Sequence, residues 1–173
     1  FMYEWQRNGI AIGNNTDTVA SADTNKGEEW RGIVTPTDGI SQGPTAEQHI
    51  IIQNIAPQID EILIYPPTNV LSSSLLNCIV TASDVDGGTP SISYSWLNTR
   101  TGQIIGTAST LQLLPNMVNP LDMIFCNATA MDIEGASSST NLGTLINNSV
   151  PVASALNLTP NAVYTDDTIR ASV

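Results

Sequence analysis

Three stretches decide the fold: residues 74–82 read SLLNCIVTA, residues 92–97 read ISYSWL, and residues 122–130 read DMIFCNATA. Each stretch is short and rich in β-branched, aromatic or other apolar side chains. Clusters of Gly, Pro, Asn and Asp separate them, which is the pattern of β-strands joined by turns. Helical periodicity is almost absent from the rest of the chain. The sequence therefore predicts an all-β protein.

Residues 55–149 contain seven such stretches, and two cysteines and a tryptophan occupy particular ones. Cys78 falls on the second stretch, Trp96 on the third and Cys126 on the sixth. This order is typical of an immunoglobulin-like (Ig-like) β-sandwich, whose two cysteines form a disulfide between the sheets. A pair of buried free thiols is the alternative. The seven predicted strands are 58–65, 74–82, 92–97, 103–106, 109–114, 122–130 and 139–147.

The chain also repeats itself at a nearly constant distance of 91 to 94 residues. The matching segments are 1–5 with 92–96, 30–38 with 124–132, 54–57 with 148–151, and 76–80 with 169–173. A fixed period of this kind is the signature of tandem structural units. We therefore expect three parts: residues 1–54, the C-terminal part of an Ig-like domain that lacks its first two strands; residues 55–149, a complete domain; and residues 150–173, the first two strands of a further domain.

Turn residues support the equivalence of the first two parts. Asn8-Gly9 follows Trp5 and predicts a type I′ hairpin turn, and Arg100-Thr101-Gly102 follows Trp96 in the corresponding place. We expect both parts to carry the same hairpin.

Three motifs recur with the repeat: Tyr-x-Trp, a strand that ends Thr-x-x-Asp before a Gly, and Asn-x-x-Pro at the start of the next unit. They fall at Tyr94/Trp96, 129–135 and 148–151, and one unit earlier at Tyr3/Trp5, 35–39 and 54–57. These residues resemble the tandem Ig-like repeats, similar to PKD and cadherin-like modules, of prokaryotic extracellular surface and fibre proteins. The resemblance implies a cell-surface or extracellular location in stalks, adhesins or fibres, and it brings no catalytic residues.

The two incomplete parts are predicted to complete one another. Gly32 stands where the complete unit has Cys126, and Ala171 stands where it has Cys78, so both halves of the disulfide are missing together. A sandwich that lacks two strands exposes sheet edges, and strand donation from another copy would cover them. We expect a head-to-tail filament of identical copies, because an open heterologous contact propagates. The predicted polymer joint comprises Gly32, Ala171, Trp5, Ile169 and Val173.

Other arrangements remain open at this point. The repeats could instead belong to one continuous polypeptide, in which residues 1–173 would be one segment and not a separate subunit. An adhesin stalk or a ligand-binding repeat of a large surface protein, whose glycan or protein ligand the sequence does not name, is the alternative function, and an accessory module of a secreted enzyme is a third.

Composition narrows the classes of function. Sixteen acidic residues against five basic ones give a net charge of −11, which disfavours nucleic acid as a partner. No apolar run reaches the length of a membrane-spanning helix, so no membrane insertion is expected. The single lysine beside abundant Ser, Thr, Asn and Gly favours a secreted or surface protein, and four Asn-x-Ser/Thr sequons, at Asn14, Asn127, Asn147 and Asn157, are candidate glycosylation sites. His49 is the one histidine and lies on a predicted strand, so we expect no enzyme activity.

Acidic loops are the candidate for a metal. Asp84 and Asp86 follow the second predicted strand, and Asp132 and Glu134 follow the sixth. In an Ig-like fold these loops meet at one end, beside the linker from the preceding unit. Carboxylate oxygens gathered there suit Ca²⁺, which would stiffen the joint. The alternative is ordinary turn chemistry, in which Asp accepts backbone hydrogen bonds and Gly takes a positive φ.

Overall fold

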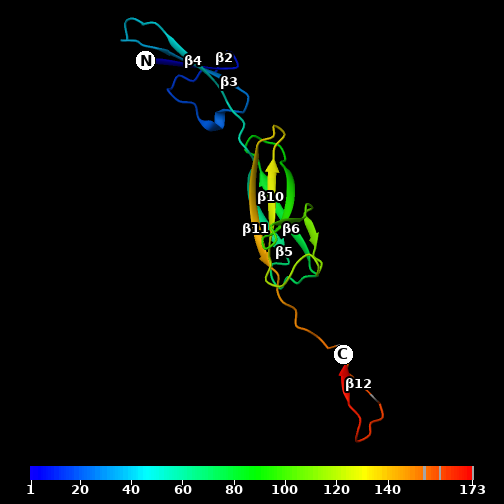
Figure 1. Ribbon diagram of the computed structural model, residues 1–173. Coiled ribbons are helices and arrows are strands. Elements are labelled where there is room, and N and C mark those ends of the chain that lie inside the picture. The colour runs from blue at the N-terminus through cyan, green and yellow to red at the C-terminus, as the bar shows by residue number, and fades with distance from the viewer. Residues whose placement is uncertain (154, 160, 173) are drawn as a thin grey trace.

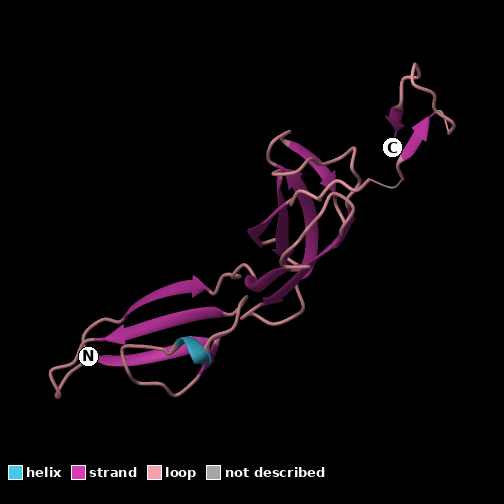
Figure 2. Cartoon of the chain, turned by 90° about the horizontal axis from the view of Figure 1, so that it is seen from below, coloured by secondary structure: helices cyan, strands magenta, loops and turns pink. Residues whose placement is uncertain are grey.

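The computed structural model describes residues 1–153, 155–159 and 161–172, and shows an all-β protein whose sheets are antiparallel. Figure 1 shows three bodies in succession along the chain, and Figure 2 shows them from a second direction. We call them the N-terminal sheet (residues 2–51), the central unit (58–146) and the C-terminal hairpin (157–172). No helix in the described part of the chain is long and apolar enough to span a membrane.

The N-terminal sheet has four strands in the order β2-β1-β3-β4. The strands are β1 (Met2–Arg7), β2 (Ile10–Ala11), β3 (Glu29–Thr35) and β4 (Ala46–Ile51), and a short 3-10 turn, Ser21–Asp23, lies in the long loop between β2 and β3. Asn8 and Gly9 have φ angles of 50° and 80° between the paired residues Arg7 and Ile10. The two-residue hairpin predicted from Asn-Gly is thus confirmed, because both loop residues take the positive φ that a type I′ turn requires.

The central unit contains two antiparallel sheets, with the strand orders β5-β6-β9 and β11-β10-β7-β8. All seven predicted strands are present, with ends that differ by at most two residues. Their bounds are β5 (Gln58–Tyr65), β6 (Leu75–Ser83), β7 (Ser91–Asn98), β8 (Gln103–Gly106), β9 (Thr110–Gln112), β10 (Met123–Met131) and β11 (Ser137–Leu145).

The core of the central unit lies between its two sheets. Alternate residues of β10, beginning with Ile124 and Cys126, are fully buried while their neighbours are not. Leu76 from the facing sheet and Trp96 from β7 are also fully buried in the same cluster. Alternation of this kind arises because successive side chains of a strand point to opposite faces.

The second hairpin differs from the first, so the prediction that both parts carry the same hairpin was wrong. Asn98 pairs with Gln103, which leaves a four-residue loop, and the N–H of Gly102 donates to the carbonyl of Asn98 at 2.8 Å. Of the loop residues only Gly102 has a positive φ, at 71°. A longer loop needs one left-handed residue at its end, and the glycine supplies it.

The C-terminal hairpin consists of β12 (Asn157–Thr159) and β13 (Arg170–Ser172). Leu158 pairs with Ala171 at its centre. Val173, one of the predicted joint residues, lies outside the described residues.

Candidate functional site

The N-terminal sheet repeats the larger sheet of the central unit in strand order and in register. Trp5 pairs with Gly32 across β1 and β3, as Trp96 pairs with Cys126 across β7 and β10. The indole N–H of Trp5 donates to the carbonyl of Thr16 at 3.0 Å, and that of Trp96 donates to the carbonyl of Ala108 at 2.9 Å. The sequence repeat is therefore also a repeat of hydrogen bonding.

The two faces of the N-terminal sheet differ in polarity. One face carries Glu29, Arg31, Glu47 and His49, which form the ion pair Arg31–Glu47 and a contact of 3.0 Å between His49 Nδ1 and Glu29 Oε1. The other face, which we call the open face, is mainly apolar. It carries Tyr3, Trp5, Trp30, Val34 and Ile50.

No second sheet covers the open face within the described residues, whereas β5-β6-β9 covers the corresponding face of the central unit. The loop of residues 12–28 lies over part of it. Trp5 and Trp30 meet edge to face with their ring centroids 6.3 Å apart, and they line a hollow of about 330 Å³ together with Val19 of the loop. Trp30 is 2% exposed but Ile50 is 55% exposed. The open face is thus apolar and partly uncovered, which is typical of an interaction surface.

The C-terminal hairpin repeats the pair formed by β5 and β6. Leu158 pairs with Ala171 as Ile64 pairs with Cys78. Ile64 and Cys78 are buried in the central core, but Leu158 is 54% exposed, and Ile169, two residues before Ala171, is 58% exposed. The hairpin therefore presents, without a partner, the side chains that its counterpart buries.

The structure joins Cys78 and Cys126 in a disulfide that links β6 to β10. At the corresponding place in the N-terminal sheet, a Cβ added to Gly32 would lie 3.0 Å from Cζ3 of Trp5. The Trp5 ring therefore packs directly against the glycine. Gly32 and Ala171 thus stand where the central unit has the two cysteines of its disulfide, and the Trp5 ring occupies the space beside Gly32.

The predicted acidic loops lie where the linker from the N-terminal sheet reaches the central unit. The side-chain amide of Asn54 donates to Asp132 Oδ2 at 2.7 Å, and the backbone N–H of Ile55 donates to Asp86 Oδ2 at 2.7 Å. The hydrogen bond from Asn54 is the main reason that the pKa of Asp132 is lowered. Lys26 and Glu134 form an ion pair of 2.7 Å, which raises the pKa of Lys26.

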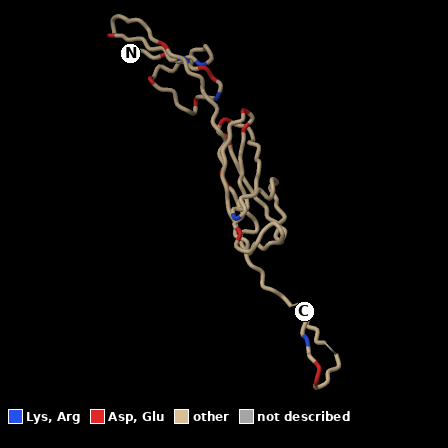
Figure 3. The backbone as a smooth tube through the Cα atoms, in the orientation of Figure 1, with Lys and Arg blue, Asp and Glu red and all other residues tan. Residues whose placement is uncertain are grey.

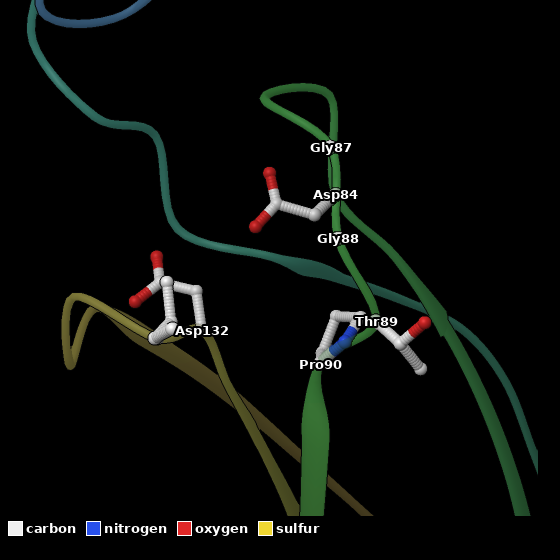
Figure 4. A pocket seen from close by; sticks show the side chains of 7 residues that line it. Asp84, Gly87, Gly88, Thr89, Pro90 and Asp132 are labelled. Atoms are coloured by element: carbon white, nitrogen blue, oxygen red, sulfur yellow. The ribbon is translucent and has the colours of Figure 1, made fainter.

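These contacts give the carboxylates partners within the protein. Asp84 Oδ1 accepts the backbone N–H of Asp86 at 2.8 Å, as in an ordinary turn. Figure 4 shows Asp84 and Asp132 on two neighbouring loops, where they line a hollow of about 180 Å³. Among the described residues, no group of three His, Cys, Asp or Glu side chains is placed to hold a metal ion. Calcium at Asp84, Asp86, Asp132 and Glu134 stays a prediction, and calcium titration of the melting temperature would test it.

Acidic residues are concentrated near this joint. Figure 3 shows Asp and Glu around the N-terminal sheet and at the adjacent end of the central unit, while the flanks of the central unit carry almost no charge. The charge of the central unit therefore lies at its two ends.

The four sequons have different surroundings. Asn14 donates from its side chain to the carbonyl of Thr18 and is half-buried, and Asn127 lies half-buried on β10. Asn147 is half-buried just after β11. Asn157 is exposed at the start of β12, and strand alternation directs its side chain away from the face that carries Leu158. A glycan at Asn157 would thus lie opposite the apolar face of the hairpin.

A buried carboxylate at the far end of the central unit has no signal in the sequence. Asp122 is 1% exposed. Its oxygens accept from Arg100 Nε, from the amide of Asn98 at 2.9 Å and from the backbone N–H of Asn119 at 2.9 Å. Arg100 is the largest of the causes that lower the pKa of Asp122 to about 2. This network ties the β7–β8 loop to the turn before β10.

We expect the central unit to lose stability as the pH falls from about 4 to about 2. The folded pKa of Asp122 lies below its unfolded value of 3.8, so its contribution is complete above pH 4 and disappears as the pH falls through about 2. Urea unfolding at several pH values measures this dependence. Asp122→Asn should be less stable at pH 7 and show a smaller loss between pH 4 and 2. Glu61→Gln, which removes an exposed carboxylate of the same unit, is the control and should retain the dependence of the unaltered protein.

Comparisons with family models, with curated proteins and with solved structures each find no significant match for this chain.

Proposed function

We propose that the protein is the structural subunit of an extracellular filament in which successive copies join head to tail by β-strand complementation. In this assembly the C-terminal hairpin of one copy covers the open face of the N-terminal sheet of the next. The observation that carries the proposal is the double repeat of register: Trp5–Gly32 matches Trp96–Cys126, and Leu158–Ala171 matches Ile64–Cys78. The two incomplete parts thus correspond to the two sheets of the central unit.

The topology of the central unit supports an Ig-like sandwich as the building block. Seven antiparallel strands in two sheets, a disulfide between the second and sixth strands, and Trp96 beside it support this assignment. A hairpin and a four-stranded sheet from two copies would together supply strands of the same types, apart from the one corresponding to β9.

The apolar surfaces support a self-contact rather than a foreign partner. Both surfaces carry residues that are buried at the equivalent positions of the central unit, and each is half of the same type of core. The contact uses one surface to bind a different surface, so it can repeat without limit and yields a filament. The abundance of Ser, Thr, Asn and Gly supports an extracellular location.

The alternative is a stalk of a large adhesin or ligand-binding surface protein in which the repeats follow one another covalently. The linker motif favours it in one respect: Asn148 to Pro151 repeats Asn54 to Pro57, the segment that connects two bodies within this chain. The two functions differ in how successive units are connected.

Mass measurement distinguishes them. We expect the native protein to sediment as long polymers and to give, after boiling in denaturant, a single species of one subunit's mass, of which this chain accounts for 18.4 kDa. A denatured mass many times larger would favour the covalent stalk. A native species that remains monomeric at high concentration would contradict the filament.

A further inference from the structure

We infer that the joint between copies is a strand pairing in one register, in which residues 168–170 of one copy, which lead into β13, pair antiparallel with residues 18–20 of the next. Arg170 would lie opposite Thr18, and Ile169 opposite Val19. This inference rests on the proposed function, and it specifies which edge of the N-terminal sheet region receives the second copy and with what alignment.

Residues 18–20 occupy the position that β9 has in the central unit. The carbonyl of Ala108, which accepts the indole N–H of Trp96, lies two residues before β9. The carbonyl of Thr16, which accepts the indole N–H of Trp5, lies two residues before Thr18. The same hydrogen bond therefore aligns residues 18–20 with Thr110–Gln112.

In the central unit, β9 is held by β6. Asn77 pairs with Thr110 and Leu76 pairs with Leu111, and the N–H of Cys78 donates to the carbonyl of Ser109 at 2.8 Å. Because Ala171 corresponds to Cys78, β13 is the counterpart of β6. Transferring these pairs to two copies sets Arg170 opposite Thr18 and Ile169 opposite Val19, and directs the N–H of Ala171 to the carbonyl of Asp17.

The receiving edge is unpaired. Within the described residues, the N–H and carbonyl of Val19 and the carbonyl of Asp17 make no hydrogen bond. The side chain of Val19 faces the hollow lined by Trp5 and Trp30, as Leu111 faces the central core. An unpaired edge next to an apolar hollow has both elements of a strand-addition site: backbone groups for the ladder and a pocket for alternate side chains.

Two local hydrogen bonds at this edge are compatible with the joint. The carbonyl of Thr18 accepts from Asn14 Nδ2 at 3.0 Å and from Thr16 Oγ1 at 2.8 Å. Its counterpart Thr110 lies one residue from Ser109, whose carbonyl is bonded to β6, so the backbone groups of Thr110 point away from that strand. The carbonyl of Thr18 is therefore free to keep its local bonds when β13 is present.

Disulfide trapping between separate chains tests the register. One chain carries Thr18→Cys and the other Arg170→Cys; neither substitution removes a side-chain hydrogen bond seen in the structure, and the native cysteines are already bridged. Directly opposed residues that are not hydrogen-bonded to each other have the closest Cβ atoms, so this pair suits a disulfide. We expect a mixed dimer on a non-reducing denaturing gel when the chains are mixed and oxidised.

Two further pairs complete the experiment. Ala20→Cys with Arg170→Cys is shifted by two residues, about 6.8 Å along the strand, and should link about tenfold less. Gly32→Cys with Ala171→Cys reports on the filament contact itself, because these positions correspond to the central disulfide. Thermal melts establish that each variant folds.

The outcomes distinguish failure of the proposed register from failure of the proposed filament. Linking of the Thr18 and Gly32 pairs with little linking of the Ala20 pair supports the register. Linking of the Gly32 pair alone, or of the Ala20 pair as well as the Thr18 pair, overturns the register and leaves the filament intact. Absence of linking in all three mixtures overturns the register and contradicts the filament as well.

Discussion

Leu158→Asp is expected to convert the polymer to monomers. Leu158 corresponds to Ile64, which is 7% exposed in the central core, so the substitution would place a charge inside each joint. Burying a Leu or Ile side chain contributes about 1.5–3 kcal/mol, and the loss is compounded because an unpaired buried carboxylate is strongly unfavourable. Sedimentation velocity at matched concentrations measures the effect, which should be at least about a hundredfold in the concentration required for assembly.

The matched control is Asn157→Asp, which adds the same charge at the neighbouring residue on the opposite side of β12. This variant should assemble like the unaltered protein. Removal of residues 150–173 should abolish assembly in the same way as Leu158→Asp. Polymers of normal length from the truncated chain would show that the hairpin is not the joint.

Removal of the disulfide is expected to have the largest effect on stability. Cys78 and Cys126 are 48 residues apart, and closing a loop of that length stabilises a protein by about 4 kcal/mol, mainly through the unfolded state. For a unit of this size, Cys78→Ala with Cys126→Ala should lower the melting temperature by roughly 15–30 °C. Differential scanning calorimetry of the double variant gives the value.

Two comparisons make this result specific. Reduction of the unaltered protein should reproduce most of the loss, because it also opens the loop. Gly32→Ala changes a residue at the equivalent position of the N-terminal sheet and should leave the transition of the central unit unchanged. A loss below about 1 kcal/mol in the double variant would mean that the packing of Trp96 and its neighbours suffices without the covalent link.

The strands could be predicted from the sequence because both of their determinants are local. Runs such as LNCIV and MIFCNATA place alternate apolar side chains on one face, and Gly, Pro and Asn end each run. The correspondence between Trp5 and Trp96 could also be recognised from short sequence segments. The pairing of Trp5 with Gly32 in the structure agrees with that correspondence. The second hairpin was mispredicted since the number of loop residues depends on where pairing stops at Asn98, which the sequence motif does not define.

The less predictable features depend on donors brought together from distant parts of the chain. The sequence marks Asp132 as an acidic loop residue, but the amide that binds it belongs to Asn54, 78 residues away. Asp122 likewise looks like a strand residue until the turn places it against Arg100 and Asn98. Clustered carboxylates in the sequence therefore indicate a cation site. In the structure, however, three of the four predicted calcium ligands (Asp86, Asp132 and Glu134) bind donors from elsewhere in the fold.

The position of the disulfide also determines how the chain responds to tension. A polypeptide pulled from its two ends can lengthen only by residues outside a covalently closed loop. The link between Cys78 and Cys126 spans 48 residues, about 160 Å of extended backbone. That length cannot be drawn out while the bond is intact. The N-terminal sheet has Gly32 at the corresponding place and therefore has no disulfide to limit its extension. The chain thus contains one unit of limited extensibility, the central unit, and one that can extend fully, the N-terminal sheet.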